Sequence, residues 1–447
     1  MTFAPMTDAD REAMLAAIGV RSVEELFADI PEDIRLQRPL DLPPAMAEAE
    51  VRRHLSALAG RNADVDRYAC FLGAGAYDHL IPAAVSQLVS RSEFYTSYTP
   101  YQPEITQGVL QATYEYQSMI AALTGMDMAN ASIYDGATAM AEGALVACAH
   151  TGRDRVVIPA AVHPEYRQVA HTYLRHQGLE VVEAPYRDGV TPLAELKARM
   201  DQRTAAVVVQ QPNFFGCLED VAAIGQLARE AGALLIVAIA DPLTLGLLAP
   251  PGAAGAHLAV GEGQPLGNNL SFGGPYLGFF AARAELVRRI PGRIAGATVD
   301  REGTRGYVLT LQTREQHIRR ERATSNICTN QALNALTAAI YLSLLGKEGV
   351  REVAAQSLQK AHYLQRAMTA LPGFEAAWTS PFFHEFVVRT TADPEELTQR
   401  LLDYQIIGGL PLGRFYPELS DCILWCVTES RTREEMDRLL KALEGLT

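Results

Sequence analysis

The chain has 447 residues, of which 48% are apolar, and a formal net charge of −13 at pH 7. A chain of this length and composition can bury a large core, most simply as one large domain and a smaller one. The excess of acidic residues argues against nucleic acid or an anionic membrane as a main partner, because phosphate binding needs a concentrated basic surface.

The first residues lack the features of a secretory signal, since acidic residues stand where a signal has basic residues and then an apolar run. No later stretch reaches the roughly 18 uninterrupted apolar residues of a membrane span. We therefore expect a cytoplasmic protein. Of the six cysteines, only Cys422 and Cys426 lie close together, and no second pair completes a zinc site, so we expect no metal.

Residues 1–60 indicate an N-terminal helical arm and linker. Thr7 or Asp8 is the candidate cap of a first helix, and a second polar helix is expected from Ser22 onward. The prolines of "RPLDLPPAMAEAEV" predict a linker before a helix near 46–60.

Residues 61–325 alternate helix-length segments with short runs rich in β-branched residues. Strands that are buried on both faces of a mostly parallel sheet have this pattern. The expected strands are "ANASIYDG", "DRVVIPAA", "EVVEAPY", "TAAVVVQQP", "ALLIVAIADP", "GAHLAVGEG" and "YLGFFAAR". The pattern predicts a large, doubly wound α/β domain.

Residues 326–447 predict a small C-terminal α+β domain. An apolar helix is expected from about 326 and a polar helix near 350–370. The strands "HEFVVRT" and "CILWCVTE" flank a helix at 393–404, and "TREEMDRLLKALEGL" predicts the last helix.

In an open α/β sheet the ligand lies outside the carboxyl ends of the strands, so the residues that follow each strand are the candidates for a site. Gly136, Ala137 and Thr138 lie between an apparent strand and a helix. Their backbone N–H groups could hold a phosphate. The alternative is a plain turn into the helix, with Asp135 or Thr138 as its cap.

Two further residues follow predicted strands. Asp241 could pair with the protonated ring nitrogen of pyridoxal phosphate (PLP), or it could simply be a turn residue. His163 could stack on the ring of such a cofactor, or it could be a helix cap or a packed histidine.

Together these positions outline a PLP enzyme of the aspartate aminotransferase fold type, PLP fold type I. Such an enzyme needs a lysine for its Schiff base, normally a few tens of residues beyond the aspartate. The stretch "GEGQPLGNNLSFGGP" at 261–275 contains none. The only lysines of the chain lie in segments that predict solvated helices or turns: Lys197, Lys347, Lys360 and Lys441.

Longer stretches carry a family resemblance. "SEFYTSYTPYQPEITQGVLQATYEYQSMIAALTGMD", "HPEYRQV", "QQPNFFGCLEDV", "GEGQPLGNNLSFGGPYLGFFA" and "TREQHIRRERATSNICTNQAL" resemble the glycine cleavage system P-protein family. The likeness is to its subunit 1, the alpha or N-terminal-half chain of the two-subunit form, and runs from about residue 3 to 445.

The resemblance implies a decarboxylating glycine dehydrogenase. In such an enzyme PLP forms an imine with glycine, carbon dioxide leaves, and the aminomethyl group passes to the lipoyl arm of the H-protein. It also implies that the catalytic lysine and the PLP belong to subunit 2 (beta), which pairs with this chain in an alpha2 beta2 heterotetramer. No cofactor is then expected to be covalently bound here, and Gly136, Ala137, Thr138, His163 and Asp241 are expected to be a vestigial site.

A chain without the lysine can still complete the partner's pocket. The candidates for such contacts lie on one loop, where related folds reach toward the neighbouring subunit's cofactor: Tyr95, Tyr98, Tyr101, Gln102 and Glu104. Arg319, one of several arginines in "TREQHIRRERATSN", could bind a carboxylate of a partner. Ordinary loop packing and a solvated helix face are the alternatives.

Three rival interpretations remain open at this point. The chain could be a complete PLP enzyme that uses Lys347 or Lys197, or a purely structural partner of the catalytic chain. A Rossmann dehydrogenase is weaker than either, because the GxG in "GAGAYD" at 73–78 follows no convincing strand.

Overall fold

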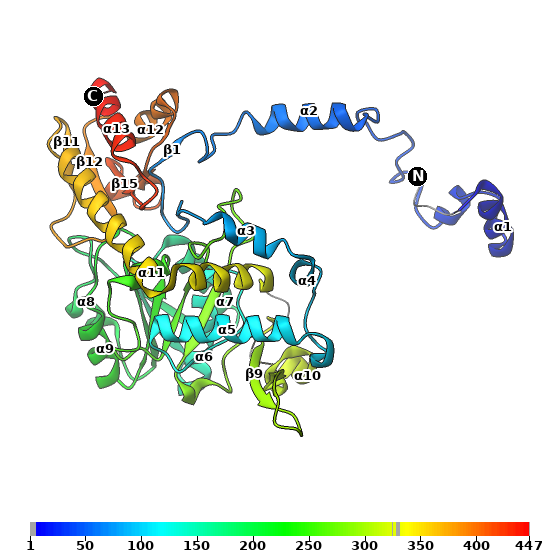
Figure 1. Ribbon diagram of the computed structural model, residues 1–447, viewed down its shortest axis with the longest axis horizontal. Helices are drawn as coiled ribbons and strands as arrows, with labels where there is room; N and C mark the ends of the chain where they lie inside the picture. The colour runs from blue at the N-terminus through cyan, green and yellow to red at the C-terminus, as the bar shows by residue number, and fades with distance from the viewer. Residues whose placement is uncertain (1–5, 324, 328–330, 447) are drawn as a thin grey trace. The chain divides into compact units, whose positions relative to one another are not determined.

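The computed structural model describes residues 6–323, 325–327 and 331–446, and the chain forms two units, Met1–Asn62 and Ala63–Thr447. The first unit holds the helices α1 (Asp8–Ile18) and α2 (Glu48–Ala59) and the short 3-10 helix Glu24–Phe27 (Figure 1). Thr7 caps α1, as predicted, because its hydroxyl accepts a hydrogen bond from the Asp10 N–H. The second polar helix is reduced to the 3-10 turn.

A seven-stranded sheet forms the centre of the second unit, with the order β2-β8-β7-β6-β5-β3-β4. All neighbouring pairs from β7 to β4 are parallel, whereas β8 runs antiparallel to β7 and β2. The predicted mostly parallel sheet is therefore confirmed. Its strands are β2 (Met128–Ala129), β3 (Arg155–Pro159), β4 (Glu180–Ala184), β5 (Thr204–Gln210), β6 (Leu234–Ile239), β7 (Leu258–Glu262) and β8 (Gly278–Ala282).

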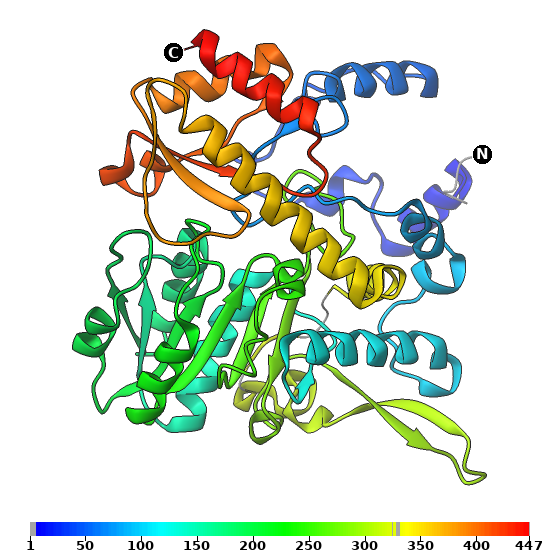
Figure 2. The ribbon, with the colours of Figure 1, turned by 60° about the vertical axis from the view of Figure 1, so that its left-hand side comes forward.

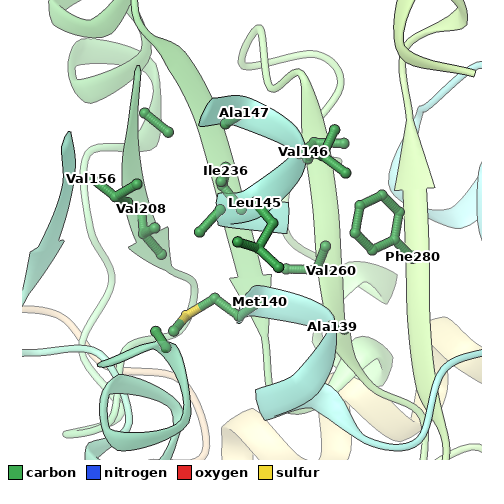
Figure 3. Close-up of a cluster of buried hydrophobic side chains, with 14 of the residues drawn as sticks. Ala139, Met140, Leu145, Val146, Ala147, Val156, Val208, Ile236, Val260 and Phe280 are labelled. Atoms are coloured by element: carbon green, nitrogen blue, oxygen red, sulfur yellow. The ribbon is translucent and has the colours of Figure 1, made fainter. Parts of the chain in front are cut away.

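Helices cover both faces of this sheet, because alternate strand residues point to opposite faces and nearly all are apolar. On one face, Val208, Ile236 and Val260 pack against α6 (Gly136–Thr151) and α7 (Pro164–Arg175). Figure 3 shows Met140 and Leu145 of α6 lying over these strand residues. The α6 helix is buried along most of its length.

The other face carries a second layer of helices. Val207, Leu235 and Val237 pack there in one cluster with residues of α5, α8, α9 and α11. Figure 2 shows α5 and α11 side by side in this layer. The bounds of these helices and of the two short helices before α5 are α3 (Ala83–Val89), α4 (Ser92–Tyr95), α5 (Gln107–Thr124), α8 (Leu193–Arg199), α9 (Val221–Glu230) and α11 (Ala332–Met368).

The last part of the chain forms a second, four-stranded antiparallel sheet of order β11-β12-β15-β14. As predicted, "HEFVVRT" and "CILWCVTE" provide two neighbouring strands, β12 (Glu385–Thr390) and β15 (Cys422–Cys426). The remaining elements are β11 (Phe374–Ala376), β14 (Leu410–Pro411), α12 (Pro394–Leu401) and α13 (Arg433–Leu446). A separate parallel pair of short strands, β1 (Ala69–Cys70) and β13 (Ile406–Ile407), connects the segment around residue 70 with the C-terminal part of the chain.

The structure differs from the predicted elements in three places. The apolar and polar helices of residues 326–370 form one element, α11, which is broken at Gly346 by a left-handed φ of 56°. The run "ANASIYDG" is mostly irregular, since only Met128–Ala129 is a strand and Ile133 makes a single bridge. An antiparallel hairpin, β9 (Ile294–Val299) and β10 (Arg305–Thr310), and the short helix α10 (Gln316–Arg319) follow β8.

The division at 325/326 stays a prediction, because residues 63–447 form one unit. In the described part of the chain no helix is long and apolar enough to cross a membrane. No three metal-binding side chains come together among the described residues either. Cys328 lies outside them, and the other five cysteines are buried and unpaired.

Gly216 of the large domain lies directly against β12 of the C-terminal sheet, so a substitution there tests how closely the two packed parts fit. Its φ is +79°, and a Cβ there would overlap the backbone carbonyl of Glu385 on β12. Gly152 has a similar φ of +68° but open space around it. We expect Gly152→Ala to lower the free energy of unfolding by about 1 kcal/mol, the cost of the left-handed backbone alone.

Gly216→Ala adds a clash with backbone and should lower the free energy of unfolding by at least about 3 kcal/mol. Urea unfolding of the two variants measures the difference. Equal losses would show that the backbone of β12 can move away at little cost.

Candidate functional site

The candidate site lies at the carboxyl edge of the parallel strands. His163 follows β3 and caps α7, Asp241 follows β6, and Gly136 begins α6. Because these strands run parallel, the residues after them meet at one edge of the sheet. The structure thus brings the three sequence-predicted positions to the same end of the large domain.

His163 is buried, and both nitrogens of its ring are engaged. Its Nε2 donates to the Ala74 carbonyl at 2.8 Å, and its Nδ1 accepts from the Glu165 N–H at 3.2 Å. Burial lowers the pKa of His163, which fits the neutral ring that these two bonds require. The ring packs against Tyr166 and Phe214 at centroid distances of 4.9 and 4.8 Å.

Asp241 forms an ion pair with a histidine of its own chain. Its Oδ2 lies 3.3 Å from His79 Nε2, and its Oδ1 accepts from the Leu243 N–H at 2.9 Å. On the other side of the ring, His79 Nδ1 lies 2.6 Å from the Glu429 carboxylate. Burial disfavours the charged histidine, but the two carboxylates outweigh it and raise the pKa of His79 to about 10.

The beginning of α6 is occupied by carboxyl groups. The Gly136 N–H donates to Glu262 at 3.0 Å, and the Thr138 N–H donates to Asp135 at 2.7 Å. Asp135 is thus the cap of α6. This matches the alternative interpretation of residues 136–138 as a plain turn into the helix. Burial raises the pKa of Glu262 to about 8, although backbone N–H groups that it binds, including that of Leu277, act in the opposite direction.

Residues 73–79, here called the plug segment, cover the carboxyl edge between these positions. Glu385 of β12 holds the segment with both oxygens: one accepts from the Ala74 N–H at 2.6 Å, the other from the Tyr77 hydroxyl at 2.9 Å. Tyr77 also exchanges two hydrogen bonds with the buried amide of Gln264. The plug segment is the "GAGAYD" stretch and the histidine that follows it, and it forms no nucleotide-binding loop.

These residues do not fit PLP. Asp241, which would pair with the ring nitrogen, already binds His79. The N–H groups that would hold the phosphate bind carboxyl groups, and a Cβ at Gly136 would overlap the Tyr166 hydroxyl. His163, which would stack on the ring, is covered by the plug segment: a Cβ at Gly75 would come within 2.8 Å of its Nε2.

Three of the four lysines, all except Lys360, lie away from this site. Lys197 is on α8, Lys441 is on α13, and the side chain of Lys347 is 92% exposed next to the break in α11. Lys360 comes nearest, but its ammonium group donates to the backbone carbonyl of Glu429. A cavity of about 760 Å³ opens beside the plug segment, and no lysine lines it.

The predicted interface residues lie on an exposed segment that runs from the last residue of α4 to the start of α5. The side chains of Tyr95, Tyr98 and Tyr101 are more than half exposed, at 56%, 73% and 55%, and Gln102 and Glu104 are exposed as well. Tyr95 and Tyr98 line an apolar groove with Leu333 and Leu336 of α11, among others.

Arg319 ends α10 and lines a different hollow, together with Arg288, Arg289, Arg314 and Arg322. Its Nε donates to the Thr313 carbonyl at 3.2 Å. The structure therefore does not bring Arg319 together with the tyrosine loop in one groove.

Sequence reasoning missed the residues that fill the site: Tyr77, His79, Glu262, Glu385 and Glu429. Two signals were available. Glu262 ends a buried strand at the edge where ligands bind, and His384 and Glu385 begin a buried strand with two ionisable residues in a row. Buried ionisable groups in such places are either paired or functional.

The pH dependence of stability tests the role of Glu385. Burial raises its pKa from 4.5 to about 7, so the folded state binds the proton more tightly than the unfolded state. Its contribution to stability is complete below pH 4.5 and is lost as the pH rises through 7. A glutamine can accept from Ala74 and donate to Tyr77, and it has no proton to lose.

We therefore expect Glu385→Gln to match the wild type near pH 5 and to be more stable near pH 8, by on the order of 1–3 kcal/mol. Unfolding midpoints across this pH range measure the difference. Glu434→Gln, an exposed change of the same charge on α13, is the control. A difference between wild type and Glu385→Gln that does not grow with pH would show that Glu385 is ionised in the folded chain.

The comparisons with known proteins identify the family of this chain. The family model of the glycine cleavage system P-protein matches residues 1–443. The probable glycine dehydrogenase (decarboxylating) subunit 1 of Desulforamulus reducens is 54% identical over 447 residues, and the match covers 100% of both chains.

Among solved structures, an inhibitor-bound glycine decarboxylase (P-protein) of the glycine cleavage system superposes with a TM-score of 0.90 at 45% identity, covering 100% of both chains. A NifS-like protein shares the fold, with a TM-score of 0.64 at 14% identity over 85% of this chain and 99% of its own. The large domain thus has the predicted PLP fold type I. The chain belongs to the glycine cleavage system P-protein family, among its glycine dehydrogenase (decarboxylating) subunit 1 members.

Proposed function

We propose that this chain is the half of a two-subunit glycine dehydrogenase (decarboxylating) that lacks the Schiff-base lysine, and that the enzyme works in the cytoplasm. The observation that carries the proposal is the plug segment, which fills the cofactor position with the chain's own side chains. PLP then belongs to subunit 2, on a lysine of that chain. When bound there, PLP supplies the electron sink for loss of carbon dioxide from glycine.

In this proposal the two chains form an alpha2 beta2 heterotetramer and pass the aminomethyl group to the lipoyl arm of the H-protein. The role of this chain is to complete the partner's site. The exposed tyrosines at the end of α4 and on the segment before α5 support that role, because exposed aromatic side chains are costly to leave in water and typical of interface anchors.

The first test follows the cofactor itself. This chain, purified with excess PLP and then desalted, should show no absorbance band of lysine-bound PLP, because its own side chains occupy the cofactor position and no lysine lines the cavity beside it. The band should appear in the presence of subunit 2, together with turnover of glycine. A band in the isolated chain, mapped to a lysine after borohydride reduction, would contradict the proposal and make the chain a complete PLP enzyme.

A second test separates completing the partner's site from a purely structural role. We expect Tyr98→Ala combined with Glu104→Gln to lower kcat of the assembled enzyme at least about tenfold, a loss of about 1.4 kcal/mol in transition-state stabilisation. Assembly itself, measured by analytical ultracentrifugation, should persist because other contacts remain. Tyr404→Ala, at another half-exposed tyrosine, is the control. Unchanged turnover in an intact assembly would favour the scaffold.

A further inference from the structure

A buried arginine, Arg293, binds one of the predicted interface tyrosines. Arg293 directly precedes β9 and is 4% exposed. Its Nη2 donates to the Tyr101 hydroxyl at 2.9 Å. The guanidinium carbon lies 5.2 Å from the centroid of the Tyr101 ring, within the range of a cation–π contact. Arg293 therefore holds Tyr101 both by its hydroxyl and by its ring.

Arg293 is itself fixed by groups on two other segments. The carboxylate of Glu315, which is 5% exposed, lies 3.8 Å from Arg293 Nε. It supplies the counter-charge that a buried guanidinium needs. The Arg293 carbonyl accepts from the Ala131 N–H at 2.8 Å, which fixes the backbone from which the side chain extends. The position of the guanidinium group is thus set before it contacts Tyr101.

The hairpin that begins after Arg293 is bound to α5 by two glutamines (Figure 1). Gln117 exchanges two hydrogen bonds with the backbone of Ala295 on β9, both at 2.9 Å. Gln107 exchanges two with the backbone of Tyr307 on β10, at 2.9 and 2.8 Å. The Gln107 amide also donates to the Pro103 carbonyl at 2.7 Å. The hairpin, α5 and the residues before α5 therefore form one connected structure.

The segment that carries Tyr101 needs such contacts to keep one conformation. This segment, residues 95–106 and here called the tyrosine loop, runs from the last residue of α4 to the start of α5. Residues 97–102 form neither helix nor strand. Fixing the backbone of such residues costs conformational entropy, about 1–2 kcal/mol each, which side-chain contacts must offset. Gln107 fixes the loop near its end, and Arg293 fixes it at Tyr101.

We propose that Arg293 is a positioning residue for the reaction of the two-subunit enzyme. It holds Tyr101, and with it the tyrosine loop, in the place where the loop completes the partner's site. The proposal rests on the proposed function, because it takes the loop to act at that site. The contacts that support it all lie within the second unit of the chain.

The test uses the full-length chain assembled with subunit 2. Tyr101→Phe keeps the ring and removes the hydroxyl that accepts from Arg293. Arg293→Lys keeps a positive charge beside Glu315, so the chain should still fold. A lysine side chain is one atom shorter and lacks the planar fork, so its ammonium group falls short of the Tyr101 hydroxyl. The two single variants and their combination form a double-mutant cycle.

We expect each single variant to lower kcat/KM for glycine at least about fivefold, because a loop held less well places its side chains less accurately. The double variant should lose no more than the more impaired single variant, since both changes remove the same contact. Thr191→Val, which removes a buried hydrogen bond to Glu219 elsewhere in the large domain, is the matched control. It should lower the unfolding midpoint and leave kcat/KM unchanged.

Unchanged kcat/KM in either single variant would overturn the proposal. Losses that multiply in the double variant would overturn it as well, since Arg293 and Tyr101 would then act separately. If Arg293→Lys does not assemble with subunit 2, Tyr101→Phe decides alone: a fivefold loss, as estimated above, supports the proposal, and unchanged kcat/KM overturns it.

The wild-type pair keeps the two proposals apart. If it does not turn over glycine, the proposed function fails, and the role of Arg293 fails with it. If it turns over glycine and the double-mutant cycle shows no coupling between Arg293 and Tyr101, only the role of Arg293 fails.

Discussion

The buried carboxyl group of Glu385 is the contact on which the arrangement of this chain depends. It reaches from β12 of the C-terminal sheet to the Ala74 N–H and the Tyr77 hydroxyl. The plug segment, held in this way, contacts His163 after β3 and Asp241 after β6 of the large sheet. One carboxyl group thus connects the two sheets through the segment that fills the space between them.

The filled site also solves an electrostatic problem. A pocket built for a charged cofactor contains ionisable groups that would be isolated and costly once the cofactor is absent. Here several of these groups are paired within the chain: His79 lies between Asp241 and Glu429, Arg431 binds Asp78, and Glu262 accepts backbone N–H groups. Burial nonetheless raises the pKa values of Glu262 and Glu385, which keeps part of this cluster close to neutral.

The fold could be predicted from the sequence because its signals are local. A few residues suffice to recognise each of these signals: the β-branched runs of β3, β5 and β6, the cap at Thr7, and the strands β12 and β15. The positions of His163 and Asp241 followed from the rule for strand ends. The break at Gly346 coincides with the predicted boundary between two helices.

The content of the site could not be predicted in the same way, because its contacts join residues that are far apart in the chain. Glu385 and Ala74 are 311 residues apart, and His79 and Glu429 are 350 apart. Neither the hydrophobic periodicity nor the spacing of residues in the sequence indicates a contact between residues so far apart. The hairpin β9–β10 was missed for a different reason: its strands carry exposed and partly polar residues, without the apolar pattern of the central sheet.

The carboxyl groups at the beginning of α6 limit how readily this position could accept a phosphate group. A single substitution that introduced a lysine after β7 would not by itself make a site for PLP, because Glu262 and Asp135 already bind the N–H groups that a phosphate would need. Removing either group alone leaves a buried donor unpaired and costs stability. Several changes would have to arise together, each unfavourable by itself. Stepwise single substitutions are therefore an unfavourable route to a phosphate-binding site at this position.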